Sequence, residues 1–234
     1  MPAAFFDGQP SSLPTEKLTA QQAIARVRHV LAGNMPTGEL LERYRPELRW
    51  FLRPECAEDI HGIGHEARVL IWQELLARLL IKDGMVLNQE ALRWAAATHD
   101  TQRVSDGIDY PHGQRAAAWV AKNLNQRLPE GVLDTVLYLD TWHVPSDNLA
   151  PEMTPELAVF KDADALDRVR IYDLDPRYLR CSYARLLLYP LAEELFEASE
   201  ARRRRDNLGA FDSVMAAALD LGLLVSEAAA AHES

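Results

Sequence analysis

Cysteine is scarce in this chain, which has two, Cys56 and Cys181, among its 234 residues. The two lie far apart in the sequence, and neither belongs to a Cys-x-x-Cys pair. The chain therefore lacks the dense cysteine framework by which small secreted domains are recognised. We expect a protein of the reducing cytoplasm.

Positive charge and long apolar runs are also in short supply. The 25 Lys and Arg residues are outnumbered by 35 Asp and Glu residues, which gives a formal net charge of −10. Binding to a phosphate backbone draws on a basic surface, so this charge disfavours nucleic acid as the main partner. No stretch approaches the roughly 18 uncharged apolar residues of a membrane span, and the N-terminus has no basic leader followed by an apolar segment. We expect neither export nor membrane anchoring.

Alternating runs of β-branched residues, which would indicate strands, are missing as well, and no internal repeat occurs. Hydrophobic residues make up 48% of the chain and charged residues 26%, which is ordinary for a globular protein. Apolar residues recur at helical spacing along most of the chain. The sequence predicts a single all-α domain over residues 15–234, preceded by a loosely ordered lead-in at residues 1–14 that is rich in Gly, Pro and Ser.

Start and stop signals divide this pattern into helices. Thr19 and Asn88 are typical N-cap residues, Pro155 suits a first helical turn, and Gly33 follows the end of an apolar pattern. The widest apolar stripe, which predicts the most strongly packed helix, covers residues 64–81. The predicted helices span residues 19–33, 64–81, 88–100, 111–128, 130–143, 155–170, 176–204 and 208–230; a weaker segment at 38–51 is interrupted by Pro46, and Pro190 is expected to kink the helix at 176–204.

Two short motifs place metal-binding side chains at helix ends. His65 follows the glycine-loosened stretch HGIG and stands in the first turn of the helix at 64–81, which is an unusual place for a core residue. His99 and Asp100 are adjacent at the end of a helix whose preceding residues are apolar. A buried helix therefore delivers an imidazole and a carboxylate to one place, where a metal ion would satisfy both.

Asp164 is a third candidate. It lies one and two helical turns after Phe160 and Leu157, on the apolar stripe of the helix at 155–170. A carboxylate buried on such a stripe requires a partner. Imidazole nitrogen and carboxylate oxygen suit Mn, Fe, Co, Ni or Zn better than Ca. Together with the two motifs above, this position predicts a site for a divalent cation.

At these positions the sequence resembles the HD-domain superfamily of metal-dependent phosphohydrolases. The signature of that family is a His, a later His-Asp pair, and a final Asp in a segment like Ala-Asp-x-Leu. The helix that begins near His65 looks like the first-His helix, ATHD at 97–100 like the central pair, and DADALD at 162–167 like the closing segment. Within the closing segment Asp164 is the better match to the last ligand. The resemblance spans residues 57–172.

The resemblance implies an HD-domain helical bundle with additional N- and C-terminal helices. Some members of the family hold a second metal through the Asp of the pair and extra histidines; His112 and His143 are the candidates here, and whether they are ligands stays open. The chain departs from the cyclic-dinucleotide phosphodiesterase branch, because His143 is followed by Val144 and no Gly-Tyr-Pro motif occurs. The four ligands implied for one divalent ion (Mn, Fe, Co, Ni, Mg or Zn) are His65, His99, Asp100 and Asp164.

The activity that the resemblance implies is hydrolysis of a phosphate ester by a metal-activated water. The acidic composition and the modest length favour a small phosphorylated metabolite or nucleotide over a polymer as the substrate. The loops at 101–111 and 144–154 are expected to form the pocket walls. Two alternatives stay open: an HD-fold oxygenase with a mixed-valence di-iron site, which six ligands would permit, and a non-catalytic metal or ligand sensor. The oligomeric state also stays open.

The residues expected to act on the substrate lie close to the expected ligands in the sequence. Asp100 would bridge or orient the reacting groups. Arg103, three residues after Asp100, and Lys161, about one turn before the closing Asp, are candidates to bind the phosphate. His61, in the glycine-loosened stretch, is a candidate substrate contact, an alternative ligand or a cap of its loop.

Overall fold

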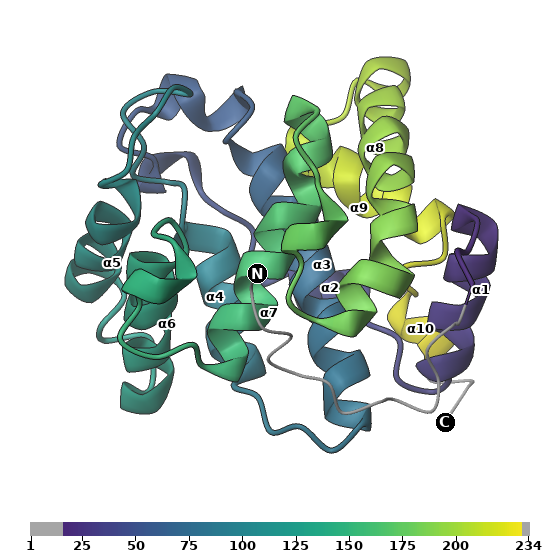
Figure 1. Cartoon of the computed structure of the whole chain (residues 1–234). Coiled ribbons are helices and arrows are strands. Elements are labelled where there is room, and N and C mark those ends of the chain that lie inside the picture. Colours follow the sequence, from purple (N-terminus) through teal and green to yellow (C-terminus); the bar gives the residue numbers. More distant parts are fainter. Residues whose placement is uncertain (1–15, 231–234) are drawn as a thin grey trace.

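The computed structural model describes residues 16–230, which form helices joined by turns and loops (Figure 1). No strand forms within these residues, where one isolated parallel bridge pairs Thr37 with Val225. The all-α prediction is confirmed, and the predicted lead-in at residues 1–14 lies outside the described residues. The α-helices are α1 (Ala20–Val30), α2 (Gly38–Glu42), α3 (Ile63–Lys82), α4 (Gln89–Thr98), α5 (His112–Asn123), α6 (Glu130–Trp142), α7 (Pro155–Leu166), α8 (Ala192–Asp206), α9 (Ala210–Asp220) and α10 (Glu227–Ala230).

The central element is α3, which packs against α4, α7 and α9. Nearly every position between Ile63 and Leu80 is buried, as expected for a helix that neighbours cover on all sides. The prediction of a strongly packed helix at 64–81 is therefore confirmed to within one residue at each end. The N-cap of α3 is Gly62, where a Cβ atom would lie 2.1 Å from the Ala57 carbonyl oxygen. This close approach requires glycine.

Side-chain caps begin three of the predicted helices. The Thr19 hydroxyl accepts a hydrogen bond from the Gln22 backbone N–H, and the Gln22 side chain accepts one in return from the Thr19 N–H. The Asn88 side chain accepts from the backbone N–H three residues later and begins α4. Thr154 caps α7 in the same way, with Pro155 as the first helical residue. The predicted starts at these positions are confirmed.

The predicted helix at 176–204 is wrong in its first half. Only α8, from Ala192, is regular; residues 176–191 contain two short 3-10 turns and a π-helical turn at Ala184–Leu188. One cause is that the buried Asp162 carboxylate accepts hydrogen bonds from the backbone N–H groups of Arg180 and Cys181, which removes them from any helical ladder. A second cause is Pro190, which has no N–H to donate.

Three other helices end earlier than predicted. The segment expected at 208–230 breaks after α9 at Gly222, whose positive φ of 72° reverses the chain. The helix at 155–170 changes to a 3-10 turn at Asp167–Ile171 and ends at Tyr172, which is left-handed with φ 56°. The helix at 111–128 is α5, which stops at Asn123.

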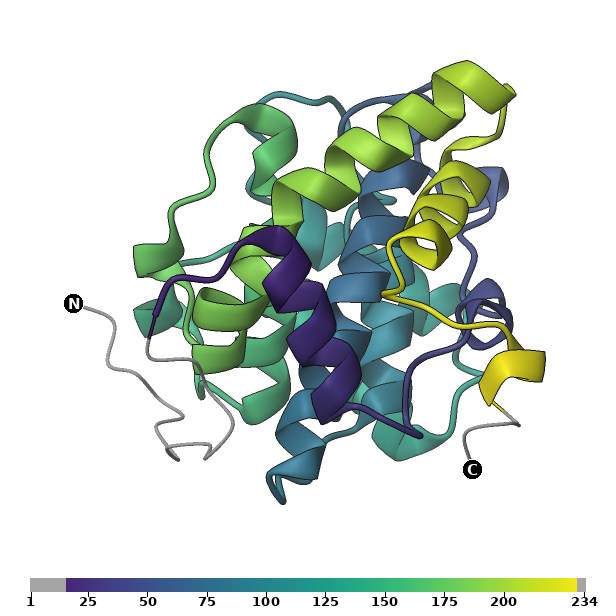
Figure 2. The same cartoon turned by 90° about the vertical axis from the view of Figure 1, so that its right-hand side faces the viewer.

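Helix pairs lie on both sides of the central element. α5 packs against α6 on one side, and α8 packs against α9 on the other (Figure 1). The view turned by 90° shows α1 in front of α3, with α8 running across the top (Figure 2). One cluster of buried hydrophobic side chains includes residues from α1 through α9. Among the described residues, no helix is long and apolar enough to cross a membrane.

Candidate metal centre

The side chains that the sequence singles out meet where five helices begin or end. α3 begins and α7 ends in the upper part of Figure 1. All but one of these side chains are buried; Asp164 keeps 28% of its side chain exposed. The six residues are His65 in the first turn of α3, His99 and Asp100 directly after α4, His112 at the start of α5, His143 directly after α6, and Asp164 in the last turn of α7.

Asp100 occupies the middle of this cluster. Its Oδ1 atom lies 2.8 Å from His112 Nε2 and 3.8 Å from His143 Nε2. Its Oδ2 atom lies 2.9 Å from His61 Nδ1 and 3.5 Å from His65 Nε2. Burial raises the pKa of Asp100, but the surrounding imidazoles outweigh burial and hold the pKa well below its usual value. One ionised carboxylate therefore faces two groups of histidines, one with each oxygen.

His65, His99 and Asp164 form one side of the cluster. The Nε2 atoms of the two histidines are 3.1 Å apart, and His65 Nε2 lies 3.4 Å from Asp164 Oδ1. Burial lowers the pKa of His99 to about 3, so its imidazole is neutral at physiological pH. His99 Nδ1 is buried and has no hydrogen-bond partner among the described residues. A neutral imidazole has a lone pair that can bind a metal ion, and the neighbouring carboxylates can bind the same ion.

Three of the four imidazoles are held with the proton on Nδ1. His65 Nδ1 lies 2.7 Å from a carboxylate oxygen of Asp167, His112 Nδ1 lies 2.5 Å from the Asp109 carbonyl oxygen, and His143 Nδ1 lies 2.7 Å from the Asp140 carbonyl oxygen. An oxygen of this kind accepts only, so the imidazole must donate. The Nε2 atoms then carry lone pairs, and all of them point into the cluster.

Lone pairs that face one another need a cation between them. His112 Nε2 and His143 Nε2 are 3.0 Å apart, and neither carries a proton when both rings donate through Nδ1. A shared proton or a metal ion removes this repulsion, and the nearby carboxylates suit a metal ion of the Mn, Fe, Co, Ni or Zn type. Within the described residues, the groups whose ligand atoms lie within 4.8 Å of one another are His61, His65 and Asp100; His65, His99 and Asp164; and His99, Asp100 and His143. The cluster is positioned to bind a metal ion.

Gly113 allows the imidazoles of His112 and His143 to lie side by side. A Cβ atom at Gly113 would lie 2.3 Å from the Asp140 carbonyl oxygen and 3.0 Å from His143 Cε1. Glycine at this position therefore permits α5 to approach the end of α6 closely. The approach brings the imidazole of His112 beside that of His143.

Metal should stabilise the protein strongly. For protein stripped with EDTA, we expect Mn²⁺ or Co²⁺ at about 100 times its Kd to add about 2.7 kcal/mol to the free energy of unfolding. For a chain of this length that corresponds to a rise in Tm of about 5–10 °C. Calorimetry or thermal fluorescence measures the shift, with Ca²⁺ as the control because it prefers oxygen ligands. An unchanged Tm with Mn²⁺, Co²⁺, Ni²⁺ and Zn²⁺ would contradict the metal assignment.

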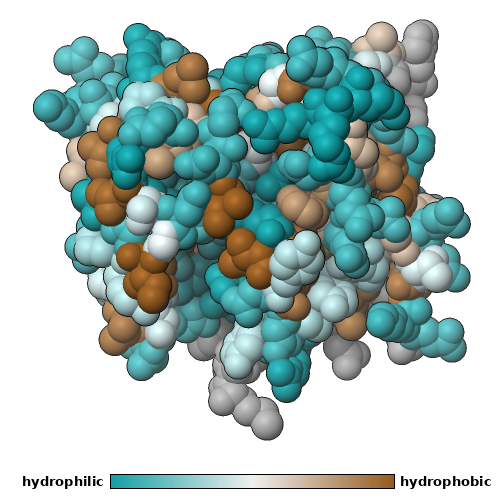
Figure 3. Space-filling model, turned by 90° about the horizontal axis from the view of Figure 1, so that it is seen from above, coloured by the Kyte–Doolittle hydropathy of each residue, from teal (hydrophilic) through white to brown (hydrophobic). Residues whose placement is uncertain are grey.

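A cavity of about 530 Å³ opens over the cluster. Arg103 reaches into it, with one guanidinium nitrogen 3.2 Å from His112 Nδ1 and 3.6 Å from Asp100 Oδ1. The face seen from above is largely hydrophilic, with a few isolated hydrophobic side chains (Figure 3). The cavity is lined by His61, Asp100, Arg103, Asp106, Gly107, Ile108, Asp109, Tyr110, His112, His143, Val144, Asp164, Arg168, Arg170 and Ile171.

The cavity lining matches part of the sequence analysis. Four of the six expected ligands and two of the expected substrate-contacting residues, His61 and Arg103, line it, while the buried His65 and His99 do not. The predicted wall at 101–111 contributes many lining residues, whereas the wall at 144–154 contributes Val144. Lys161 is not brought to this cavity: its Nζ donates to the Pro145 carbonyl oxygen and lies 3.0 Å from Asp147 Oδ1.

Sequence reasoning missed Asp167 and Arg170. Asp167 is fully buried against His65 Nδ1, and Arg170 lines the cavity with a guanidinium nitrogen 3.0 Å from His61 Nδ1. A signal was present, because Asp167 follows Asp164 by three residues and so shares its side of a helix. Arg68 likewise follows His65 by three residues and binds the same Asp167 carboxylate.

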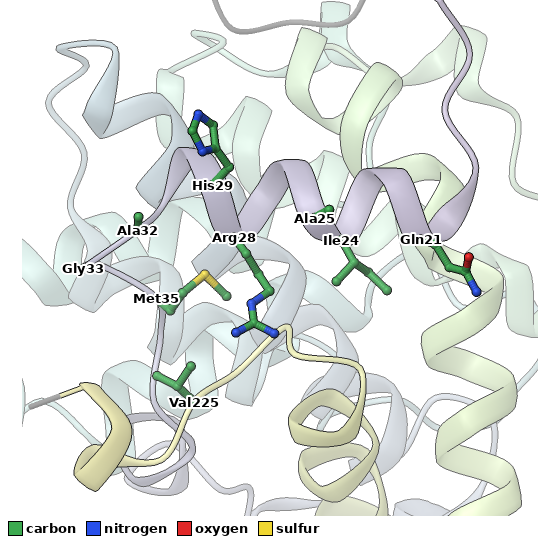
Figure 4. A pocket seen from close by; sticks show the side chains of 9 residues that line it. All are labelled: Gln21, Ile24, Ala25, Arg28, His29, Ala32, Gly33, Met35 and Val225. Carbon is green, nitrogen blue, oxygen red and sulfur yellow. The ribbon is translucent and has the colours of Figure 1, made fainter. Parts of the chain in front are cut away.

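A larger hollow lies elsewhere and lacks this chemistry. It has a volume of about 820 Å³ and runs along α1 toward Val225 (Figure 4). Its lining holds one imidazole, His29, and one guanidinium, Arg28, both exposed and without a carboxylate beside them in the lining. None of the groups able to hold a metal ion among the described residues includes these side chains.

Comparison with known proteins does not assign the chain to a family. No protein-family model matches it, and neither the curated proteins nor the solved structures give a significant match. What can be said of its function therefore follows from the geometry of the cluster and from the local motifs that supply it.

Proposed function

We propose that the protein is a metal-dependent phosphohydrolase of the HD type that acts on a small phosphorylated molecule. The observation that carries this proposal is the position of Asp100, whose two oxygens each face imidazole nitrogens at the floor of one cavity. Arginine side chains stand around the same cavity. Cations below and guanidinium groups beside a cavity suit a phosphate ester.

The cluster offers ligands for one or two divalent ions. One ion would be held by His65, His99, Asp100 and Asp164, and a second by Asp100 with His112 and His143. A bound divalent ion lowers the pKa of water and neutralises charge on phosphate oxygens. The resemblance of the local motifs to the HD-domain superfamily supports the same set.

The remaining side chains would bind and orient the substrate. Arg103 and Arg168 both line the cavity, and a guanidinium group can bind two phosphate oxygens at once. His61 lines the cavity with its Nδ1 atom 2.9 Å from Asp100 Oδ2, within reach for moving a proton near the reacting phosphate. The sequence also predicts that Lys161 binds the phosphate. Its ammonium group is paired with Asp147, so nothing in the structure adds support to that role.

One feature favours a second candidate function, an oxygenase with two iron ions. The histidine pair on the Oδ1 side of Asp100 completes a six-residue ligand set, as such a site would need. Oxygen uptake by the iron-loaded protein, measured with candidate polyols and phosphonates, would support this function. A non-catalytic sensor is the remaining alternative, and it predicts ligand binding without turnover.

Phosphate release tests the proposal directly. Purified protein with Mn²⁺, Co²⁺, Ni²⁺ or Mg²⁺ is incubated with nucleotides, sugar phosphates and phosphodiesters, and the Asp100→Ala variant serves as the blank. We expect metal-dependent release from at least one class, lost in the blank. If no substrate in the panel releases phosphate and the iron-loaded protein takes up oxygen with a substrate, the protein is an oxygenase and not a hydrolase. If Asp100→Ala releases as much phosphate as the unmodified protein, the assignment of this site is wrong.

A further inference from the structure

Asp167 lies behind the metal centre. It is fully buried and stands at the junction between α7 and the following 3-10 turn. It touches His65 at Nδ1, the nitrogen on the far side of the ring from the cluster. Asp167 is absent from the cavity lining, and the ring of His65 separates its carboxylate from the other ligand atoms of the cluster.

Two guanidinium groups hold this carboxylate in place. Arg68 Nε donates to Asp167 Oδ1 at 2.5 Å, and a second Arg68 nitrogen donates to Oδ2 at 3.2 Å. Arg170 adds a nitrogen 3.4 Å from Oδ2. Arg68 is itself fixed, since its guanidinium lies 5.1 Å from the centre of the Phe196 ring. A carboxylate clamped from this side can present Oδ2 to His65 in one orientation only.

The contact with Oδ2 determines which nitrogen of His65 is free. The Nδ1–H group donates to Oδ2 at 2.7 Å, which leaves a lone pair on Nε2. Nε2 then points at His99 Nε2, 3.1 Å away, and at Asp164 Oδ1, 3.4 Å away. Carboxylates that accept from the outer nitrogen of a metal-bound imidazole fix both its tautomer and its orientation.

We propose that Asp167 is a positioning residue of the metal centre, which keeps the proton of His65 on Nδ1 and directs Nε2 at the metal. This inference rests on the metal site of the proposed function. Its test measures metal binding, however, and not turnover. If the protein binds metal but hydrolyses no phosphate ester, the proposed reaction fails and the role of Asp167 is still decided by the binding data.

The informative variant is Asp167→Asn. Arg68 requires an oxygen acceptor, so the amide oxygen should face Arg68 and the amide NH₂ should face His65 Nδ1. Because an NH₂ group donates, it favours the tautomer of His65 that accepts at Nδ1 and carries its proton on Nε2. A proton on Nε2 blocks metal binding at that nitrogen. Titration with Co²⁺ alone, followed by absorption and calorimetry, should show an affinity about 10- to 100-fold weaker and an altered Co²⁺ spectrum.

Asp162→Asn is the matched control. Asp162 lies on the same helix and is also fully buried, and it too binds a guanidinium, that of Arg180. It also accepts hydrogen bonds from the backbone N–H groups of Arg180 and Cys181, and none of its hydrogen bonds reaches an imidazole of the cluster. We expect this variant to lose stability but keep the Co²⁺ affinity and spectrum of the unmodified protein. Equal affinities in all three proteins, or equal losses in both variants, would overturn the role of Asp167.

A second measurement covers the case in which Asp167→Asn does not fold. Nitrogen-15 spectra of the histidines in the metal-free, unmodified protein report the tautomer of each ring, with His65→Gln used to assign the signal. We expect His65 to carry its proton on Nδ1. A signal showing the proton on Nε2 would overturn the inference without any variant of Asp167.

Discussion

Replacing Asp100 by asparagine is expected to weaken metal binding about a thousandfold and to abolish phosphate release. The carboxylate is buried, and its oxygens lie 2.8–3.8 Å from imidazole nitrogens on both sides. Removing one partner from a buried, charged cluster costs about 3–5 kcal/mol, and every 1.4 kcal/mol is tenfold in affinity. The asparagine amide also offers one oxygen in place of two, and its NH₂ group donates hydrogen bonds and cannot bind a cation.

The measurement for Asp100→Asn is a metal titration combined with the release assay on the best substrate found. Asp162→Asn again provides the control, because it removes an equally buried charge away from the imidazoles. If Asp100→Asn kept the metal affinity and the activity of the unmodified protein, the assignment of Asp100 as the central ligand would be wrong. A loss of activity with intact affinity would limit Asp100 to a role in the reaction.

The sequence predicted those features that depend on neighbours in the chain. The starts of α1, α4 and α7 were predicted from Thr19, Asn88 and Pro155, and the capping contacts at these starts stay within three residues. The placement of His99 and Asp100 beside an apolar helix likewise needs no knowledge of the rest of the fold. Local signals of this kind determine where a side chain leaves a helix.

The segment DADALD shows what could not be predicted. Its three carboxylates have three different tasks: Asp162 holds the backbone at 180 and 181, Asp164 faces His65, and Asp167 binds Nδ1 of the same histidine. Spacing places Asp164 and Asp167 on one side of the helix, but their partners come from a segment about a hundred residues earlier. A pattern of charges along one helix does not say which distant side chain each charge will meet.

Distant partners also explain why the predictions for Lys161 and for the helix at 176–204 differ from the structure. Lys161 lies one turn before Asp164, yet its ammonium group turns to the loop at 145–147 because Asp147 and a carbonyl oxygen stand there. The helical pattern at 176–204 is real, but the buried carboxylate of Asp162 takes the N–H groups that a helix would need. In both cases a tertiary contact outweighs a local preference.

Replacing Glu66 by glutamine is expected to change the free energy of unfolding strongly, in a way that depends on pH. Glu66 is fully buried beside His65, and neither of its carboxylate oxygens has a hydrogen-bond partner among the described residues. Burial, and then the nearby Asp100 and Asp140 carboxylates, raise the pKa of Glu66 well above its usual value of 4.5. The folded, metal-free protein therefore keeps a proton on Glu66 at pH values where the unfolded chain has lost it.

This retained proton determines the sign of the pH dependence. Between pH 4.5 and the higher pKa of the folded state, the native protein binds more protons at Glu66 than the unfolded chain, so the free energy of unfolding falls as the pH rises. The fall from one such group is about 1.4 kcal/mol per pH unit. Glu66→Gln does not titrate, so relative to the unmodified protein it should gain stability by that amount for each unit across the window.

Urea unfolding between pH 4 and pH 8 in EDTA measures the two curves, and Glu74→Gln is the matched control on the same helix. Glu74 is equally buried, but Arg78 and Arg93 each place a guanidinium nitrogen 2.7 Å from its oxygens. Neutralising it leaves two cations without their partner, so this variant should be destabilised by about 3–5 kcal/mol. If Glu66→Gln raises the free energy of unfolding at high pH and Glu74→Gln lowers it, then pairing, and not burial alone, decides whether a buried carboxylate stabilises the fold. Parallel pH curves for Glu66→Gln and the unmodified protein would contradict a retained proton on Glu66.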